Sequence, residues 1–299
     1  MTTATRPTAP APATTRPTPP SKWPHTLGLL ASLAVVILSV WLVDANWIRI
    51  ADLPAAIGNY LGLMGAGLAH NPLEVPWSEY WVLAIGRMLE SIQMAWIGTL
   101  IGAVLSLPLG FLAARTVSPA GVVFVTRQFL NAVRALPEII LAIVLIMPIF
   151  GLGPLTGALA LGIGSIGTLG KLTAEAIESI DQGPVEAALA AGARPVQRMR
   201  WAILPQALPE IVAFWLYRFE INIRASAVLG VIGAGGIGSL LSQLFNRREW
   251  EQIGITLVVI ILVTIAVDSI SGAVRARIIS GGGRRLAARE RRDEASAIV

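Results

Sequence analysis

Long apolar runs separated by polar segments dominate the pattern of this chain. A helix needs about 20 residues to cross a bilayer, and the apolar run Ile139–Gly170, at 32 residues, is too long for one crossing. The Gly151-Leu-Gly-Pro154 segment predicts a turn inside it, so this run is expected to form two antiparallel spans. With it, the pattern predicts an all-α polytopic membrane protein of about six helices, the other spans being Leu27–Val43, Ser91–Ala114, Pro209–Ile232 and Gln252–Gly272.

Two N-terminal segments need separate interpretation. Leu27–Val43 resembles a signal-peptide core, but a long Pro/Thr-rich tail precedes it and no small-residue cleavage site follows, so an uncleaved first helix is expected. Leu53–Ala69 is apolar and Gly-rich, with Asn59 and Tyr60 near its centre. Counting it as a span would invert every later loop, so an interfacial helix on the outer surface is expected.

The distribution of Lys and Arg predicts the orientation. With the N-terminus inside, the outer segments 44–90 and 233–251 hold four basic residues, whereas the inner segments hold 17, these being 1–25, 115–136, 171–210 and 273–299. This asymmetry follows the positive-inside rule. Both termini are therefore expected in the cytoplasm.

Composition excludes several classes of chemistry. Hydrophobic residues make up 55% of the chain and charged residues 14%, with a mean hydropathy of +0.69, whereas soluble domains average about 25% charged. Cysteine is absent and only His25 and His70 supply imidazoles, which leaves no thiolate, disulfide or His-based metal centre or triad. No catalytic residue and no metal site is predicted.

Three glycine-rich segments resemble nucleotide-binding motifs. Gly162–Gly167 and Gly233–Gly238 match the dinucleotide glycine spacing, but both lie in or beside predicted spans rather than after a strand. Gly170-Lys171-Leu172 lacks the hydroxyl residue that would hold Mg²⁺ in a phosphate-binding loop. Small residues in membrane helices favour close packing instead, so the chain is expected to bind no ATP or other cofactor by itself.

The segment between the fourth and fifth spans carries the most specific pattern. Its Ala-rich sequence, Glu186-Ala-Ala-Leu-Ala-Ala-Gly192, predicts a short helix. Gly192 and Pro195 end that helix, and Arg194, Arg198 and Arg200 make the following piece basic. An ordinary solvated loop is the simplest alternative.

This spacing resembles the signature loop of bacterial ABC importer permeases, in which Glu-Ala-Ala, three residues, Gly, nine residues and Ile-x-Leu-Pro follow one another. The sequence matches that pattern but has Ala202 at the Ile position, with Ile203 one place later. The matching residues are Glu186, Ala187, Ala188, Gly192, Leu204 and Pro205. The resemblance implies a type I ABC importer permease fold with a cytoplasmic coupling helix, in which Glu186, Ala187, Ala188, Gly192 and Arg194 contact a partner ATPase.

Within the resemblance, which runs from about Ser91 to Arg277, Arg134–Glu138 and Ile221–Gly238 are similar to the phosphonate-type branch. Methionine-type permeases are similar around Gly-Ala-Gly-Gly, but lack the Glu220-x-Asn-x-Arg224 arrangement. The resemblance implies a phosphonate, phosphite or phosphate ester as the solute.

The charged residues of the fifth span also indicate an anionic solute. Glu220 and Arg224 are four residues apart, so they share a helix face and can pair. A charge deep in a span usually faces a bundle interior or an aqueous path, and the Arg fork suits phosphate-like oxyanions. The candidate pathway residues are Arg224, Glu220, Asn222, Arg134 and Glu138; a structural ion pair is the alternative. Asp268, Arg275 and Arg277 are interpreted as marking the end of the last span.

The resemblance also implies an assembly in the plasma membrane of a bacterium. Two copies of the permease would surround one path, with a cytoplasmic ATPase dimer that binds ATP and Mg²⁺, an extracytoplasmic binding protein, membrane lipids and no nucleic acid. The expected domains are a disordered tail (1–25), a first helix with an interfacial segment (26–90), a permease core (91–277, with the coupling loop at about 175–205) and a basic tail (278–299).

Three alternatives remain at this stage. A methionine- or osmoprotectant-type permease belongs to the same class. An ion-coupled secondary transporter would be supported by inverted hydropathy repeats, which the sequence does not display. An intramembrane enzyme would need a nucleophile or metal constellation, which the residue content does not supply.

Overall fold

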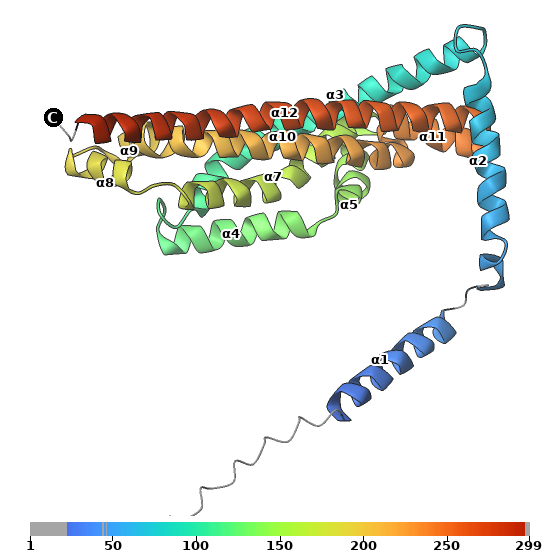
Figure 1. Cartoon of the computed structure of the whole chain (residues 1–299), viewed down its shortest axis with the longest axis horizontal. Coiled ribbons are helices and arrows are strands. Elements are labelled where there is room, and N and C mark those ends of the chain that lie inside the picture. Colours follow the sequence, from blue (N-terminus) through green and yellow to red (C-terminus); the bar gives the residue numbers. More distant parts are fainter. Residues whose placement is uncertain (1–22, 44, 46, 297–299) are drawn as a thin grey trace, which may run out of the picture. The chain divides into compact units, whose positions relative to one another are not determined.

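The computed structural model describes the backbone of residues 23–43, 45 and 47–296, and the side chains within 23–278 apart from that of residue 24. All regular secondary structure in these ranges is helical (Figure 1). The chain divides into two units, Met1–Ala56 and Ile57–Val299, which are described separately.

The first unit contains helix α1, Trp23–Leu42. Its 20 residues extend over about 30 Å, the thickness of the hydrocarbon core, and it is long and apolar enough to cross a membrane. The helix predicted at Leu27–Val43 is confirmed. Residues 1–22 of the predicted tail, 1–25, lie outside the described residues. Helix α1 begins at Trp23, so the last residues of that predicted tail are helical. A short 3₁₀ turn, η1, follows at Trp47–Ile50.

Helix α2, Leu53–Ala69, begins in the first unit and continues in the second. From residue 57 on it runs across the N-terminal end of α12, Trp250–Ser296 (Figure 1). The Tyr60 and Trp250 rings lie 4.5 Å apart, and Gly67 packs against the backbone of Glu251. At 17 residues α2 is shorter than a typical span; its location at the membrane interface stays a prediction.

The centre of the second unit is the pair of helices α3, Trp77–Ala113, and α7, Pro154–Glu178. Gly98, Gly102 and Gly110 lie on the face of α3 that contacts α7. A Cβ on Gly98 would lie 2.7 Å from Leu161 Cβ, and one on Gly102 would lie 2.5 Å from Ser165 Cβ. The two backbones can approach this closely only because small residues face one another.

The first arm of the predicted 139–170 hairpin differs from the prediction. It consists of α5 (Glu138–Ile140), a π-helical segment η2 (Leu141–Ile146) and α6 (Met147–Phe150). Its thirteen residues cover only about 20 Å, so this arm reaches the length of a span only together with the helix before it, residues 120–135.

Residues 120–135, predicted as loop, form helix α4, Ala120–Ala135, packed on α7. Together α4 and the short arm make one helix pair bent by 81°. The bend follows from Pro137, because a residue before proline is driven to extended backbone, and Leu136 has ψ 119°.

The predicted turn at Gly151–Pro154 is confirmed. Gly151 and Gly153 have φ values of +77° and +136°, which glycine adopts without steric cost, and Pro154 is the first residue of α7, a position that suits its fixed φ. The Gly153 N–H donates to Gly233 O at 3.0 Å, which ties this turn to a second break in the bundle.

That second break separates α10, Leu204–Leu229, and a π-helical segment η4, Gly230–Ala234, from α11, Gly236–Arg247; the helical segments on its two sides are bent by 56°. Gly233–Gly238 lies in this break, and Gly162–Gly167 lies within α7. No strand precedes either segment among the described residues, so both motifs serve helix packing or turning. The predicted span Pro209–Ile232 corresponds to α10 and η4.

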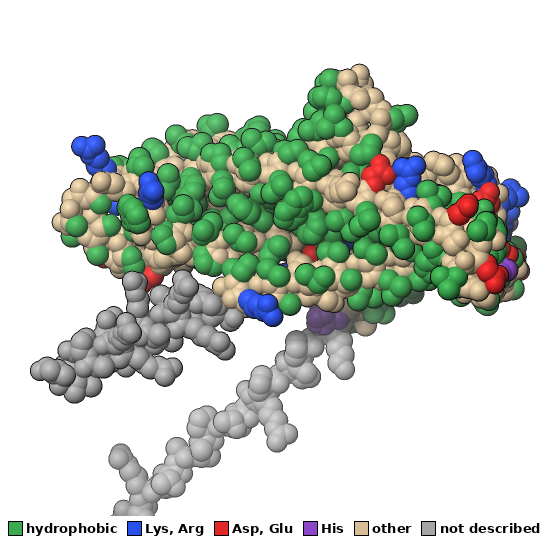
Figure 2. All heavy atoms as spheres, turned by 90° about the horizontal axis from the view of Figure 1, so that it is seen from above, with side chains coloured by type: hydrophobic (Ala, Val, Ile, Leu, Met, Phe, Trp, Pro, Cys, Tyr) green, Lys and Arg blue, Asp and Glu red, His purple; other side chains and the backbone are tan. Residues whose placement is uncertain are grey.

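The outer surface of the bundle is apolar. Figure 2 shows hydrophobic side chains over most of the visible face, and Val104, Val144 and Leu262 are 64%, 69% and 59% exposed. Such a surface suits a bilayer rather than water. Within the described part of the chain, four helices are long and apolar enough to cross, or six if each bent pair is one span, in agreement with the six predicted.

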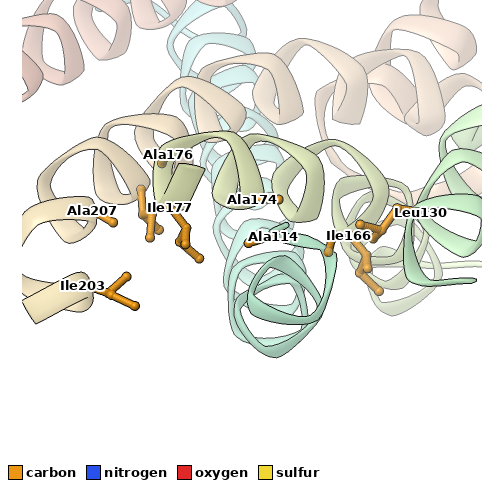
Figure 3. Packing of buried hydrophobic residues seen from close by; sticks show 10 residues of the cluster. Ala114, Leu130, Ile166, Ala174, Ala176, Ile177, Ile203 and Ala207 are labelled. Carbon is orange, nitrogen blue, oxygen red and sulfur yellow. The ribbon is translucent and has the colours of Figure 1, made fainter. Parts of the chain in front are cut away.

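Buried residues hold the bundle together at the end where α7 and α10 meet (Figure 3). This cluster joins α3, α4, α7 and α10 through residues such as Ala114, Leu130, Ile177, Ile203 and Ile211. Between α7 and α10 the chain forms α8 (Gly183–Ala190), α9 (Pro195–Arg198) and a π-helical segment η3 (Met199–Ile203). The cluster therefore anchors the base of the loop that carries the signature pattern.

Candidate functional site

The first half of the loop is a helix ended by a glycine. Glu186 lies in the first turn of α8 and is exposed, as is Ala187, while Ala188 is half-buried. Gly192 has φ +75°. The Ala193 N–H donates to Ala188 O at 3.0 Å and the Gly192 N–H to Leu189 O at 2.9 Å. These two bonds form a Schellman cap, so the sequence-predicted end of the helix at Gly192 is confirmed.

The second half continues directly into the membrane helix. The Arg194 N–H donates to Gln197 Oε1 at 2.8 Å, and Pro195 begins α9. Ala202 and Ile203 are both buried, so the one-place shift of isoleucine from the family pattern still leaves an isoleucine in the core. The Gln206 amide donates to Asp181 O at 3.3 Å, which closes the base of the loop.

The tip of the loop presents apolar side chains to its surroundings. Leu189 is 57% exposed, and Val196 and Trp201 are each 71% exposed. The Arg200 guanidinium lies 5.3 Å from the centre of the Trp201 ring. Exposed apolar residues on a capped helical hairpin are typical of a docking surface, whereas a loop surrounded by water is expected to expose polar side chains.

A buried polar cluster lies inside the bundle, formed by Glu138, Arg218, Ser165, Asn222 and Thr99. Arg218 Nη2 donates to Glu138 Oε1 at 2.7 Å and Arg218 Nε to Ser165 Oγ at 2.9 Å. The Arg218 side chain is 9% exposed and that of Glu138 33%. The ion pair therefore links α10 to the segment that follows the bend at Pro137.

Asn222 joins the same cluster one turn along α10. Its Nδ2 donates to Thr99 Oγ1 at 2.9 Å and to Ser165 Oγ at 3.1 Å. The Ser165 hydroxyl donates to Leu161 O at 2.6 Å, so its one donor and two acceptor sites are all used. Through these bonds α3, α7 and α10 are held together by polar contacts in an otherwise apolar interior.

The opposite face of α10 carries two ion pairs to α12. The Glu220 carboxylate accepts from Arg275 Nη2, and Arg224 Nη1 lies 3.4 Å from Asp268 Oδ2. Glu220 and Arg224 do not pair with each other, because α12 supplies each residue with a partner of its own. Asp268 and Arg275, interpreted from sequence as marking the end of a span, thus fix α12 against α10.

The five candidate pathway residues therefore do not form one site. Asn222 and Glu138 belong to the buried polar cluster, Glu220 and Arg224 face α12, and Arg134 is exposed near the end of α4. Sequence reasoning gave no role to Arg218, although a second i, i+4 polar pair on α10, Arg218 and Asn222, could have found it. The sequence around Ser165 and Thr99 contains no pattern that would have indicated their part in the cluster. Among the described residues, no three His, Cys, Asp or Glu side chains gather to hold a metal ion.

Comparisons with known proteins agree with this architecture. Residues 106–280 match the family model of the binding-protein-dependent transport system inner membrane component. The chain is 39% identical over 260 residues to the phosphite transport system permease protein PtxC of Stutzerimonas stutzeri, covering 85% of this chain and 90% of that protein. It is 41% identical over 191 residues to the phosphate-import permease protein PhnE of Mycolicibacterium smegmatis, covering 64% of this chain and 36% of that protein.

A solved chain of the MetNI methionine ABC transporter, in an inward-facing conformation, has the same fold. It superposes with a TM-score of 0.60 at 24% identity, covering 69% of this chain and 99% of the solved one. The predicted all-α permease fold is confirmed. With a matching model over more than half of its length, the chain belongs to the family of binding-protein-dependent transport system inner membrane components.

Proposed function

We propose that this chain is the membrane-spanning subunit of an ATP-driven importer and passes a phosphonate-like oxyanion, such as a phosphonate, phosphite or phosphate ester, across the plasma membrane of a bacterium. The observation that carries the proposal is the coupling loop. It is a capped helical hairpin with an exposed apolar tip. Its second half runs through η3 directly into α10, and residues 179–182 join its first half to α7.

The geometry of the loop supports a mechanical role. A cytoplasmic ATPase dimer, binding ATP and Mg²⁺, would dock on the tip with Glu186, Ala187, Ala188, Gly192 and Arg194 at the contact. Displacement of the hairpin would move α7 and α10 together, because Gln206 and the core cluster fix the base. The permease itself would bind no nucleotide, and an extracytoplasmic binding protein would deliver the solute.

The choice of solute is supported by the named relatives. The two relatives described above are named for phosphite transport and phosphate import and are 39% and 41% identical to this chain. The methionine transporter chain is 24% identical. A methionine-type or osmoprotectant-type solute is thus the weaker candidate. An ion-coupled mechanism would not explain the coupling hairpin, because it requires no partner ATPase.

A role in the pathway is proposed for Arg224. Its side chain is 54% exposed and contacts Asp268 at the long distance of 3.4 Å. An exposed guanidinium in a membrane-crossing helix is costly unless it faces water or a partner. A second copy of this chain across a shared aqueous path would satisfy that requirement. Glu138, whose side chain is one third exposed, is proposed as a second pathway residue on the other face of α10, with Glu220, Asn222 and Arg134 as further candidates.

The test of the coupling loop is Gly192→Asp in cells that express the chain with its ATPase and binding protein. A carboxylate would be placed on the docking surface, and ATP-dependent uptake of phosphite or methylphosphonate is expected to be abolished while the chain still inserts in the membrane. Gly192→Asn is the matched control. Asparagine has the same size and also tolerates left-handed backbone, but it adds no charge, so uptake is expected to fall only in part.

Normal uptake by Gly192→Asp would contradict the coupling role. Uptake by the unmodified chain that persists after ATP depletion, and collapses with the ion gradient, would instead favour an ion-coupled transporter. Parallel uptake of methionine and glycine betaine decides between the solute classes.

A further inference from the structure

A pocket with basic and polar walls lies where α3 ends and α4 begins. Its volume is about 480 Å³, and it is lined by Arg115, Ser118, Ala120, Val123, Phe124, Arg127, Gln128 and Asn131. A smaller neighbouring pocket of about 170 Å³ shares Arg127 and Asn131 and includes Lys171. Neither pocket contains a residue of α8, α9 or the buried polar cluster.

The charges around the larger pocket leave one cation uncompensated. Glu178 Oε1 accepts from Arg127 Nη2 at 2.6 Å and from the backbone N–H of Arg115 at 2.6 Å. Arg127 Nε donates to Ala113 O at 2.9 Å. Glu178 is thus occupied by Arg127 and a backbone amide, while the Arg115 guanidinium is exposed and contacts no acceptor among the described residues. The pocket therefore carries a free guanidinium beside a second arginine that is held in place.

An exposed aromatic ring lies at the pocket beside these charges. Phe124 lines the pocket and is 65% exposed. Val123, Thr126 and Leu130 form the buried face of α4, and the exposed Val122, Val125 and Phe129 lie on the other flank of that buried face, away from the pocket. A ligand that fits the pocket has an anionic group beside an apolar part that contacts Phe124.

We propose that the pocket binds the phosphate group of an anionic phospholipid, with an acyl chain against the exposed ring of Phe124. The proposal rests on the proposed orientation, which places this end of the bundle, the end of the coupling loop, at the cytoplasmic leaflet. Basic pockets between membrane helices on that side are suited to anionic head groups. The bound lipid would brace the α3–α4 turn against the end of α7, five residues before α8.

The test is lipid retention by the purified chain, measured by native mass spectrometry with phosphatidylglycerol and phosphatidylcholine of identical acyl chains. Phosphatidylglycerol is expected to be retained preferentially. Arg115→Gln is expected to weaken its binding about fivefold, the effect of one basic side chain near an anionic surface, and Arg115→Lys to restore most of it. Arg200→Gln removes an equal charge outside the pocket and is expected to leave binding unchanged.

The Arg115 variant is expected to fold, because the side chain is exposed and its backbone N–H makes the bond to Glu178. Asn131→Glu is a second, independent variant that places a carboxylate in the pocket and is expected to repel the head group. Equal retention of the two lipids, or unchanged binding by both pocket variants, would overturn the proposal.

Inorganic phosphate separates a lipid site from a site for a soluble anion. Millimolar phosphate is expected not to displace phosphatidylglycerol from the chain. If phosphate displaced the lipid and bound the lipid-free chain in an Arg115-dependent manner, the occupant would be a soluble oxyanion and the lipid proposal would be wrong. Because these measurements need no transport, their outcome is independent of the uptake tests of the proposed function.

Discussion

Replacing Glu138 by leucine leaves the Arg218 guanidinium without the carboxylate that it contacts at 2.7 Å. Removing one partner of a fully buried ion pair costs about 3–5 kcal/mol, mostly because the other charge stays buried and unpaired. The Arg218 side chain is 9% exposed, but Glu138 is 33% exposed, so solvent screens part of the interaction. The free energy of unfolding is therefore expected to fall by about 2 kcal/mol, roughly a thirtyfold change in the unfolding equilibrium.

The measurement is equilibrium unfolding in mixed micelles, titrated with sodium dodecyl sulfate and followed by tryptophan fluorescence. Glu175→Leu is the matched control, because Glu175 pairs with Lys171 at 3.8 Å and both side chains are about half exposed. Exposed pairs of this kind contribute less than about 0.5 kcal/mol. The control variant should therefore unfold almost as the unmodified chain does.

A double-mutant cycle tests the physical reason. Arg218→Met together with Glu138→Leu removes both charges, and the double variant is expected to lose at least about 1 kcal/mol less than the sum of the two single variants. Additive losses would show that the two side chains are not energetically coupled. Equal losses for Glu138→Leu and Glu175→Leu would refute the view that burial makes the Arg218 pair important.

Two further predictions concern packing and transport. Gly98→Leu is expected to lower the free energy of unfolding by about 1–3 kcal/mol or to prevent folding, since even a Cβ would lie 2.7 Å from Leu161 Cβ. The control Gly86→Ala, whose Cβ meets nothing within 4 Å, should be neutral or slightly stabilising. Equal stabilities of the two variants in micelles would contradict the close α3–α7 contact. Arg224→Gln is expected to reduce oxyanion uptake severalfold with normal insertion and ATPase docking, and undiminished uptake would leave Arg224 a structural role only.

The local sequence determined those elements of the fold that depend only on residues close together in the chain. Apolar length identified α1, α3 and α12 as crossing helices, because a bilayer requires about 20 apolar residues whatever they pack against. Gly151 and Pro154 determined the turn between α6 and α7, since φ restrictions act on the residue itself. Gly192 ended α8 for the same reason. The signature spacing of the loop identified the family before any contact was known.

The tertiary structure decided where each charge found its partner and which helices were broken. The i, i+4 rule allows Glu220 to pair with Arg224, but α12, 44 to 55 residues further along the chain, supplies each with an opposite charge. Glu138 lies 80 residues from Arg218, and no local pattern connects them. Pro137 predicts a break, but the 81° bend also depends on the packing of α4 against α7. Helix-forming rules act over one or two turns, whereas ion pairs and bends depend on which helices the bundle brings together.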